Sequence, residues 1–495
     1  MSTLTSLLDH ARPDRPALVV PDDGAVSYGR LRALVDEAAS ELAAFGVRGG
    51  DRVAMAFPNG PEAIVLFLAA AQVATACPLN PAYTEDEFRY YLEDTGARVL
   101  LVPPGEGEAA RRALGETGTA IEVAIRDGRL TMESAAPRRP ASAGVRSGED
   151  VALVLHTSGT TSRPKRVPLR HRNLLASVRN VVASYALTAD DVSLCVMPLF
   201  HVHGLVASAL ATFASGGTAV VPRRFTPMAF WPLTRAIHPT WFTASPTPHQ
   251  LILMRVQEDR PPGTERLRFV RSCSSALSPA LMAQMEARFG VPVLEAYGMT
   301  EASHQMASNP LPPGRRVPGS VGVATGVEIA ILDERGARVR QGGAGEVAIR
   351  GESVIAGYEN NPQANAASFT DGWFRTGDQG TLDEAGYLRL SGRIKELINR
   401  GGEKIAPREI DEVLEAHPSV EQAVAFGVPH ATWGEEVHAA VVLREPVSEA
   451  DLIAHCRRHL AEFKVPRRLH IVDSIPRTPT GKVQRRFVAA ELAGG

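Results

Sequence analysis

The sequence is poor in cysteine and in aromatic residues. Four cysteines occur among 495 residues, and aromatic residues make up 6% of the chain. Cys77, Cys195, Cys273 and Cys456 are scattered, with no C-x-x-C pair and no histidine-rich neighbour. The pattern therefore indicates neither a disulfide framework nor a structural zinc site. We expect a reducing, cytoplasmic setting.

Net charge and long hydrophobic runs are also lacking. The 53 Lys and Arg residues nearly balance the 55 Asp and Glu residues, leaving a formal charge of -2, so no global field favours nucleic acid or an anionic membrane. The N-terminus has no basic segment followed by an apolar one, as a secretory signal would. The weakly polar stretch from Gly204 to Pro222 is interrupted by polar residues and glycines, which favours a buried helix, a turn and a strand. We expect neither a nucleic-acid partner nor a membrane span.

The sequence does have the length and composition of a folded protein with several domains. At about 100 to 200 residues per domain, the length allows two to four domains. Hydrophobic residues make up 44% and charged residues 22%, which is ordinary globular usage. Short apolar runs alternate with amphipathic segments, which predicts an α/β fold with mostly parallel sheets. The clearest predicted strands are 151–155, 219–221 and 293–294, and the clearest predicted helices are 28–45, 173–185 and 278–289.

Two regions suggest how the chain is divided. Residues 103–150 are rich in Gly, Glu, Arg and Pro, and they read as a polar surface excursion. After about Leu390 the pattern changes to a glycine turn, a helix from Pro407 to Ala416 and a strand from Val420 to Val428. We therefore expect a large N-terminal domain over residues 1–393 and a small α+β C-terminal domain over 394–495, with a hinge at Lys395.

The strongest local signal is a strand that runs into a hydroxyl-rich loop and then a lysine. Small hydroxyl residues around a glycine offer O–H and backbone N–H donors to phosphate oxygens, and the lysine adds a compact positive charge. It is not a Walker loop, because no second glycine precedes the lysine and Pro164 lacks an N–H. The predicted phosphate-binding residues are Thr157, Ser158, Gly159, Thr160, Thr161, Ser162 and Lys165.

Together with further stretches, this loop resembles the adenylate-forming superfamily, which contains acyl-CoA synthetases, carrier-loading adenylation domains and firefly luciferase. The matches occur in the family's order along essentially the whole chain, and their wording is most similar to that of oxalate–CoA ligases. The further stretches are Pro198–Gly204, Glu295–Glu301, Trp373–Asp378, Gly392–Glu396 and Pro479–Arg485. The resemblance implies a large adenylate-forming domain followed by a small mobile one.

The resemblance also assigns roles in nucleotide binding. It places Tyr297 against adenine, Thr300 on the α-phosphate and Glu301 on Mg²⁺, with Glu295 and Ala296 in the same nucleotide-binding stretch. A carboxylate is the hard ligand that Mg²⁺ prefers while it neutralises phosphate charge. Asp378 is expected to accept hydrogen bonds from the ribose hydroxyls, and Arg393 to contact ribose or phosphate.

Four residues of the C-terminal part receive roles in the same way. Lys482 is expected to attract the acid carboxylate and the α-phosphate together while negative charge builds up. Lys395 resembles the hinge about which the small domain rotates, and Gly401 and Gly402 resemble the turn beside the pantetheine tunnel of CoA. The neighbouring Arg485 and Arg486 read as solvated charges.

The acid pocket is predicted to be polar. His201 corresponds to the family's gate residue beside the acyl carboxylate, and His203, Ser274, Ser275 and His304 stand at pocket positions. Four polar groups around an alkyl chain would be costly, since each needs a partner, whereas around a small dicarboxylate they are useful donors.

Two positions depart from the family wording. Arg166 follows the loop lysine where the family usually has glycine, and Gly298 stands where the subgroup tends to have alanine. Since glycine at such a place commonly serves close backbone approach, we expect Arg166→Gly to raise the rate or the affinity for ATP. If Arg166 instead contacts phosphate, the affinity should fall.

The sequence therefore predicts an ATP- and Mg²⁺-dependent acid–CoA ligase that works through an acyl-adenylate, with Lys482, His201, Thr300 and Glu301 as its catalytic residues. Oxalate is the expected acid. The alternatives are a ligase for malonate or for another short, fatty or aromatic acid, an enzyme that loads a carrier protein, and a nucleotide-binding protein without catalysis. The expected partners are the acid, ATP and CoA, in a monomer or a homodimer.

Overall fold

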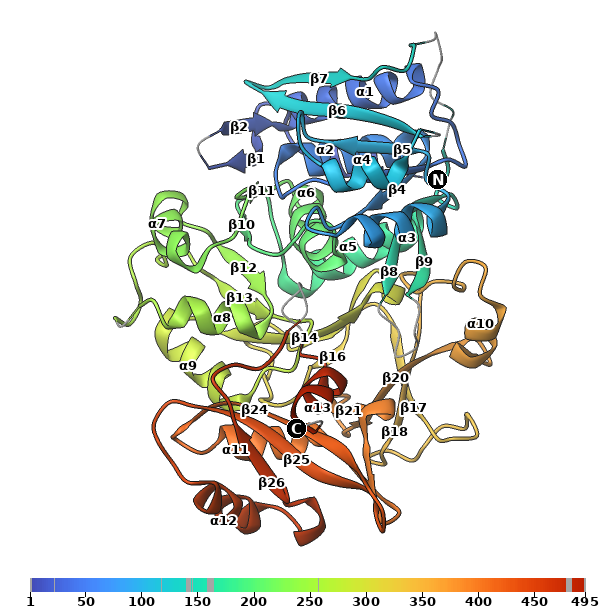
Figure 1. Cartoon of the computed structure of the whole chain (residues 1–495). Coiled ribbons are helices and arrows are strands. Elements are labelled where there is room, and N and C mark those ends of the chain that lie inside the picture. Colours follow the sequence, from blue (N-terminus) through green and yellow to red (C-terminus); the bar gives the residue numbers. More distant parts are fainter. Residues whose placement is uncertain are drawn as a thin grey trace.

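The computed structural model describes residues 2–21, 23–116, 118–138, 144, 146–157, 164–256, 258–477 and 483–493. Three β-sheets build a large N-terminal domain, and a fourth sheet builds a smaller C-terminal domain (Figure 1). Ser158, Gly159, Thr160, Thr161, Ser162 and Lys482 lie outside the described residues. The predicted α/β fold with a smaller second domain is confirmed.

The sheet that carries most of the site has nine strands. Its central strands β11, β10, β12, β13 and β14 run parallel, and antiparallel pairs close both edges. Its strands, in spatial order, are β16 (Val323–Ala324), β15 (His304–Ser308), β14 (Val293–Met299), β13 (Phe269–Ser272), β12 (Trp241–Ala244), β10 (Val192–Cys195), β11 (Thr218–Val220), β1 (Pro16–Val20) and β2 (Gly24–Ser27).

A second large sheet has seven strands and is also mostly parallel. Its last two strands, which precede and follow the predicted phosphate loop in the sequence, pair in antiparallel orientation. Its strands, in spatial order, are β7 (Arg129–Glu133), β6 (Thr119–Arg126), β5 (Val99–Val102), β3 (Arg52–Met55), β4 (Thr75–Pro78), β8 (Val151–Thr157) and β9 (Lys165–Arg170).

The other two sheets are mostly antiparallel. The third sheet of the large domain contains β17 (Glu328–Leu332), β18 (Gly345–Arg350), β20 (Trp373–Leu382), β19 (Phe369–Thr370) and β21 (Leu388–Arg393). The C-terminal sheet contains β23 (Glu403–Ile405), β22 (Ile398–Arg400), β25 (Gly434–Leu443), β24 (Val420–His430) and β26 (Arg468–Ile471).

Thirteen α-helices among the described residues cover these sheets. They are α1 (Tyr28–Ala44), α2 (Pro61–Val73), α3 (Glu85–Thr95), α4 (Glu108–Leu114), α5 (His171–Tyr185), α6 (Ala211–Ala214), α7 (Pro227–Ile237), α8 (Pro246–Leu253), α9 (Pro279–Phe289), α10 (Pro362–Ser368), α11 (Pro407–Glu415), α12 (Glu449–His459) and α13 (Arg485–Ala493). Short 3-10 helices span Leu4–Leu8, Thr300–Ala302, Ile394–Glu396 and Glu462–Lys464, and a π-helix spans His203–Leu210. Within the described part of the chain, no helix is long and apolar enough to cross a membrane.

Helix ends follow signals in the sequence. The Ser278 side chain accepts the N–H of Leu281 at the start of α9, Pro279 is the first helical residue, and Gly290 ends the helix with a φ of 69°. A hydroxyl cap and an initial proline satisfy or avoid orphan N–H groups, and glycine takes the left-handed conformation at little cost. The predicted helices 28–45, 173–185 and 278–289 are confirmed within a few residues.

The expectation that residues 103–150 form only a polar excursion is wrong. They contain α4, β6 and β7, and β6 pairs with β5 in register. Ile121, Val123 and Ile125 of β6 are buried at alternate positions, as in a strand with one face toward the core. The Gly, Glu, Arg and Pro content of the surrounding region outweighed this signal.

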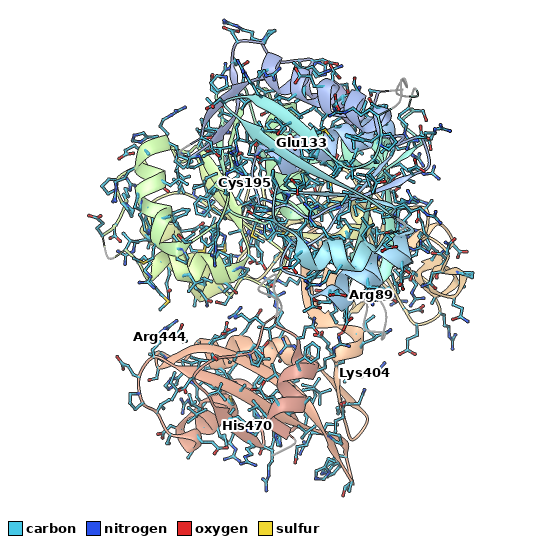
Figure 2. The ribbon with its side chains drawn as sticks, turned by 45° about the horizontal axis from the view of Figure 1, so that its top comes forward. Arg89, Glu133, Cys195, Lys404, Arg444 and His470 are labelled. Atoms are coloured by element: carbon cyan, nitrogen blue, oxygen red, sulfur yellow. The ribbon has the colours of Figure 1, made fainter. Side chains whose placement is uncertain are left out.

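The two domains have separate apolar cores. The C-terminal domain has its own apolar cluster, which includes Ile410, Leu414, Val441 and Leu452. Figure 2 shows Lys404, Arg444 and His470 on this domain, apart from Arg89, Glu133 and Cys195 on the large one. The boundary at residues 393 and 394 and the hinge at Lys395 remain predictions.

Candidate active site

The site forms where parallel strands of the nine-stranded sheet end. The carboxyl ends of β10, β12, β13 and β14 lie side by side, as their register shows. Ligand sites of open α/β sheets characteristically occur at this edge. Here the edge gathers His203, which follows β10, Thr243 of β12, Ser274, which follows β13, and Glu301, which follows β14.

The stem of the phosphate loop meets a buried carboxylate. Glu301 is 6% exposed. Its Oε1 accepts the hydroxyl of Tyr358 at 2.8 Å and that of Thr157 at 3.5 Å. The Lys165 ammonium lies over the Tyr358 ring, 4.5 Å from its centroid, and burial lowers its pKa. Thr157, Lys165 and Glu301, which were predicted separately, are therefore brought together.

Glu301 also suits the expected magnesium ion. It is one nearly buried carboxylate beside the loop, and among the described residues no cluster of three or more His, Cys, Asp or Glu side chains could hold a metal. Mg²⁺ at a nucleotide site is usually held by one or two carboxylates together with substrate phosphates and waters. The residues present fit a magnesium ion that arrives with ATP.

The predicted adenosine-binding residues form a second cluster. Asp378 and Arg393 are opposite each other on β20 and β21, and Arg393 Nε lies 3.0 Å from Asp378 Oδ1. The Tyr297 hydroxyl donates to Asp378 Oδ2, and burial raises the Tyr297 pKa well above its ordinary value. An ionised carboxylate has about four lone-pair sites, so Asp378 retains acceptor capacity for ribose hydroxyls.

The predicted acid pocket is polar and connected. His203 Nδ1 lies 2.9 Å from Ser274 Oγ, and His203 Nε2 lies 2.7 Å from Thr243 Oγ1. The rings of His203 and His304 are 5.1 Å apart, and both side chains are nearly fully buried. His203, Ser274 and His304 therefore form one network.

The network surrounds a cation that the sequence patterns did not assign to the site. Arg271 of β13 is fully buried, and among the described residues no carboxylate forms an ion pair with it. Its guanidinium instead contacts neutral groups: Tyr185 Oη at 2.8 Å, Thr243 Oγ1 at 3.0 Å, Gln305 Oε1 at 3.1 Å, His203 Nε2 at 3.3 Å and His304 Nδ1 at 3.4 Å. Burying a charge without a counter-ion is costly, so this arrangement indicates that an anion belongs nearby.

Arg271 also determines which nitrogen of each histidine carries the proton. A guanidinium can only donate, so His203 Nε2 and His304 Nδ1 must accept. His203 therefore carries its proton on Nδ1 and donates to Ser274, whose own O–H is left to donate to a bound group. His304 carries its proton on Nε2.

The backbone around the pocket adopts unusual conformations. Ser274 has a φ of 74° and His304 a φ of 128°, values that non-glycine residues seldom take. Such conformations persist where the surroundings impose them, often at functional sites. A Cβ on Gly298 would come 2.3 Å from the His304 carbonyl oxygen, and one on Gly204 would come 2.4 Å from that of Pro198. Gly298, which departs from the subgroup wording, is thus what allows His304 its position.

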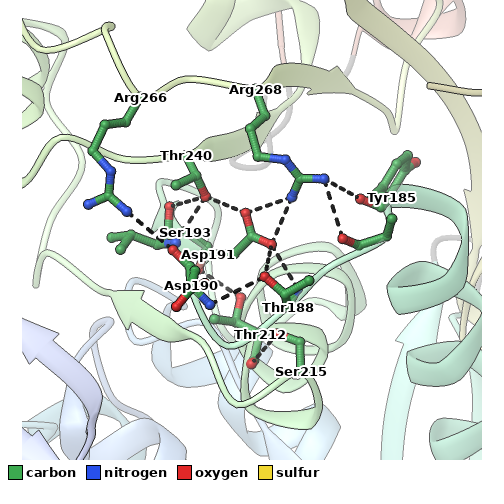
Figure 3. Close-up of polar contacts among 12 residues, drawn as sticks. Tyr185, Thr188, Asp190, Asp191, Ser193, Thr212, Ser215, Thr240, Arg266 and Arg268 are labelled. Carbon is green, nitrogen blue, oxygen red and sulfur yellow. Dashed lines mark hydrogen bonds and ion pairs between the residues drawn. The ribbon is translucent and has the colours of Figure 1, made fainter. Parts of the chain in front are cut away.

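A second polar network holds Arg271 and its partner Tyr185 in place. Figure 3 shows Arg268, just before β13, bound to Asp191, and Arg268 also donates to the Tyr185 carbonyl oxygen at 3.1 Å. Asp191 is 2% exposed and accepts Arg268 Nη1 on both oxygens at 2.7 Å and the Thr240 hydroxyl at 2.7 Å. This network fixes the end of α5 to the start of β13.

The remaining predicted residues differ in their surroundings. Ser275 is exposed, although its neighbour Ser274 is in the pocket. His201 packs its ring on Phe200, with centroids 4.7 Å apart. Thr300 is partly buried beside Glu301, and Ala296 is buried in β14. Gly401, Gly402 and Lys395 lie on the C-terminal side, in an exposed turn and a short 3-10 helix.

The predicted nucleotide-site residue Glu295 has a partner from the other domain. It is fully buried, its Oε1 accepts the Leu277 N–H at 3.0 Å, and burial raises its pKa to about 7. Arg408 Nη2, on α11 of the C-terminal domain, lies 3.8 Å from the same oxygen. Neither that nitrogen nor Glu295 Oε2 has a hydrogen-bond partner among the described residues.

The reading of Arg485 as solvated is wrong. Its guanidinium binds Asp411 and the Ala425 carbonyl oxygen, at 2.7 Å for the latter, and only Arg486 of the pair is exposed. Arg485 therefore joins α13 to α11. A basic residue near the end of a chain gave no sign of this, because its partners are about 60 to 74 positions away.

Of two features that the sequence patterns did not assign to the site, one had a signal in the sequence and the other had none. Arg271 stands within the apolar strand from Phe269 to Ser272, and a charge in a strand that is buried on both faces indicates a functional or paired group. Tyr358 follows Gly357 in a region without a motif, and only the fold brings it to Glu301.

Comparison with known proteins agrees with this geometry. The family described as AMP-binding enzyme matches residues 9–359, and the family described as AMP-binding enzyme C-terminal domain matches residues 409–482. The oxalate–CoA ligase of Arabidopsis thaliana is 47% identical, covering 98% of this chain and 98% of its own. The sulfoacetate–CoA ligase of Cupriavidus necator is 40% identical, covering 96% and 94%.

A solved structure shares the arrangement of the whole chain. ATP-bound MatB from Rhodopseudomonas palustris superposes with a TM-score of 0.90 at 32% identity, covering 99% of this chain and 98% of its own. The match includes both domains. The chain thus belongs to the AMP-binding enzyme family and is an ATP-dependent acid–thiol ligase of the adenylate-forming superfamily.

Proposed function

We propose that this enzyme converts oxalate, CoA and ATP into oxalyl-CoA, AMP and pyrophosphate. The observation that carries the proposal is the buried Arg271, which has no anionic partner among the described residues and lies behind His203, Ser274 and His304. A dicarboxylate brings the second negative charge that such a pocket favours.

The alternative of a long apolar acid fits the same pocket poorly. Each methylene buried against apolar walls contributes about 0.8 kcal/mol, but histidine and serine groups here would lose hydrogen bonds without replacement. Hydrogen bonds to a charged group contribute about 1.5 to 3 kcal/mol each, so two or three of them can select a small anion that has no apolar surface.

We propose that the first half-reaction joins the acid to the nucleotide. A carboxylate oxygen of the acid attacks the α-phosphorus of ATP, and the bond to pyrophosphate breaks. The loop 157–162, Lys165 and Thr300 hold the phosphates, Glu301 holds Mg²⁺, which neutralises phosphate charge, and Tyr297, Asp378 and Arg393 hold the nucleoside. Lys482 attracts the acid and the α-phosphate together, and His201 lies beside the reacting carboxylate.

In the second half-reaction the CoA thiol attacks the acyl carbon, and AMP leaves with the electron pair of the broken bond. We propose that the C-terminal domain, residues 394–495, turns about Lys395 between the two steps and places Gly401 and Gly402 beside CoA. Ile394–Glu396 is a short exposed segment between β21 and β22, and such a segment can absorb the torsion changes of domain closure. The buried free cysteines support a reducing, cytoplasmic setting.

Other acids remain alternatives within the same reaction. Malonate and sulfoacetate also carry a second acidic group that Arg271 could favour. A carrier-protein thiol in place of CoA is a further alternative, and activity with free CoA excludes it.

The test is pyrophosphate release with a panel of acids and free CoA. The panel contains oxalate, malonate, sulfoacetate, acetate and palmitate, together with oxamate, which keeps the size of oxalate but replaces one carboxylate by an amide. Since one charged hydrogen bond is at stake, oxalate should exceed oxamate in kcat/KM by at least about tenfold. Preference for palmitate or acetate would reject the pocket assignment and leave only the family-level activity.

The histidines of the pocket give a prediction for mutants. His203→Ala and His304→Ala should each lower kcat/KM for oxalate by about tenfold or more, equivalent to about 1.4 kcal/mol, because His304 is itself a candidate donor and His203 orients the Ser274 hydroxyl as one. The KM for ATP should change little. His249→Ala is a control of the same type, since that buried histidine bonds the Arg271 carbonyl oxygen instead of facing the pocket. An equal loss for oxalate and oxamate in the two pocket mutants would contradict a role in selecting the second carboxylate.

A further inference from the structure

Arg166, the residue next to the predicted phosphate loop that departs most from the family, is bound by carboxylates of other segments. His156 of β8 and Arg166 of β9 are opposite each other in the hairpin. Both reach the same oxygen of Asp94, near the end of α3: His156 Nε2 lies 2.9 Å and Arg166 Nε 3.2 Å from Asp94 Oδ2. The guanidinium of Arg166 is thus engaged by a carboxylate of α3, a role that neither expectation drawn from the sequence included.

The same arginine joins the stem to another segment of the site. Arg166 Nη1 lies 3.9 Å from Glu359 Oε2, and the Arg166 carbonyl oxygen accepts the Glu359 N–H at 3.2 Å. Arg52 of β3 completes the group with a contact of 2.6 Å to Glu359 Oε1. Two arginines thus balance two carboxylates.

This cluster is shielded enough for its ion pairs to matter. The exposed fractions of the Arg166, Glu359 and Asp94 side chains are 15%, 19% and 28%. Burial lowers the pKa of His156, so this ring does not replace the positive charge of Arg166. Ion pairs at such partly buried positions contribute more than exposed ones, and removing one partner leaves the other charge poorly compensated.

The residues that are adjacent in sequence to the members of this cluster belong to the candidate active site. Thr157 and Lys165 are the neighbouring cross-strand pair of the hairpin, and alternate residues of a strand face opposite sides. Tyr358, beside Glu359, lies under Lys165 and donates to Glu301. The ion pairs of Arg166, on one face of the β8–β9 hairpin, therefore hold in place Thr157 and Lys165, whose side chains are on the opposite face.

We propose that Arg166 is a positioning residue for ATP: its ion pairs with Asp94 and Glu359 hold the stem of the phosphate loop and the segment at Tyr358 in register. Arg166 does not itself touch the nucleotide. The inference rests on the proposed phosphate-binding role of this loop, but it is independent of which acid the enzyme uses.

The experiment compares Arg166→Ala with Arg170→Ala on the same strand, since Arg170 forms an exposed ion pair with Glu149. Acid-dependent pyrophosphate release is measured against ATP and acid concentrations, and thermal unfolding is followed for each variant. Arg166→Ala should raise the KM for ATP about fivefold with the KM for the acid nearly unchanged, as loss of a partly buried ion pair predicts. Arg170→Ala should change neither value by more than about twofold.

Two further variants separate positioning from general destabilisation. Arg166→Lys keeps the charge and should recover most of the ATP affinity. In an Asp94→Asn background, Arg166→Ala should have a smaller additional effect, because the part of its effect that passes through Asp94 is already lost and only the longer contact with Glu359 remains. Arg166→Gly should weaken ATP binding as Arg166→Ala does.

Three results would overturn the proposal. They are tighter ATP binding in Arg166→Gly, full additivity of Arg166→Ala with Asp94→Asn, and equal increases of KM for ATP and acid. Lys165→Ala tests the underlying role of the loop separately: if it leaves the KM for ATP unchanged, the loop assignment fails, whatever the Arg166 variants show.

Discussion

Replacing Arg271 by methionine is expected to lower kcat/KM for oxalate by at least about a hundredfold, equivalent to about 2.7 kcal/mol. The substitution keeps the approximate length of the side chain but removes the positive charge behind the pocket. It also frees His203 Nε2 and His304 Nδ1 from the donor that fixes their tautomers. Steady-state kinetics with oxalate and oxamate measure the effect, and it should be much smaller for oxamate.

Controls separate the charge of Arg271 from its packing. Tyr185→Phe removes only the hydroxyl that contacts Arg271 Nε at 2.8 Å, so its loss should stay within about tenfold. Arg271→Lys keeps the positive charge but lacks the planar guanidinium group. Its loss of kcat/KM for oxalate should therefore lie between those of Tyr185→Phe and Arg271→Met. ATP binding measured directly, together with thermal unfolding, shows whether each variant is folded. Undiminished oxalate activity in folded Arg271→Met would remove the main support for a dicarboxylate substrate.

Lys482→Ala is expected to lower the rate of adenylate formation by about a thousandfold or more, because this step needs a positive charge where the acid carboxylate meets the phosphates of ATP. Transfer of the acyl group from a supplied acyl-adenylate to CoA should stay within about threefold of the wild-type rate. Lys482 lies outside the described residues, but the flanking Arg477 and Val483 pair as an antiparallel bridge. Arg477 also bonds Thr247 of α8, which ties this segment to the large domain.

The two half-reactions are measured separately, as acid-dependent pyrophosphate release and as thioester formation from the adenylate. Arg486→Ala is the matched control, since Arg486 is an exposed charge four residues beyond Lys482. It should leave both rates within about twofold, as expected for a surface position. Equal losses of both half-reactions in Lys482→Ala would show that this lysine supports folding or both steps, and would reject the division of labour between the domains.

The parts of the site that could be predicted from sequence are those whose chemistry is local. The loop 157–165 carries hydroxyls, glycine and lysine within nine residues, and Glu295–Glu301 carries its motif within seven. The structure brings Thr157 and Lys165 to Glu301, while their roles in binding ATP stay predictions. His203, Ser274 and His304 were correctly expected to belong together, and the structure joins them through 2.9 Å and 5.1 Å contacts.

The remaining parts depend on contacts between distant positions. Arg166 meets Asp94 and Glu359, which are 72 positions before it and 193 positions after it in the printed numbering, and no spacing rule links them. The difference between Ser274 and Ser275 is a matter of backbone conformation, because a φ of 74° turns one serine into the pocket while its neighbour is exposed. Such outcomes follow from tertiary packing, which overrides local pattern.

The contact between Arg408 and Glu295 links the position of the C-terminal domain to proton binding. Glu295 has a pKa of about 7 while Arg408 lies 3.8 Å from it. Two further charges act on it in opposite directions, since Glu412 raises its pKa and Arg389 lowers it. If α11 withdraws, the buried carboxylate loses its nearest cation, its pKa rises further, and near neutral pH it takes up a proton. Movement of the domain is then coupled to the binding and release of a proton by Glu295. Because the withdrawn state binds more protons, the fraction of molecules with α11 docked at Glu295 increases as the pH rises through neutrality.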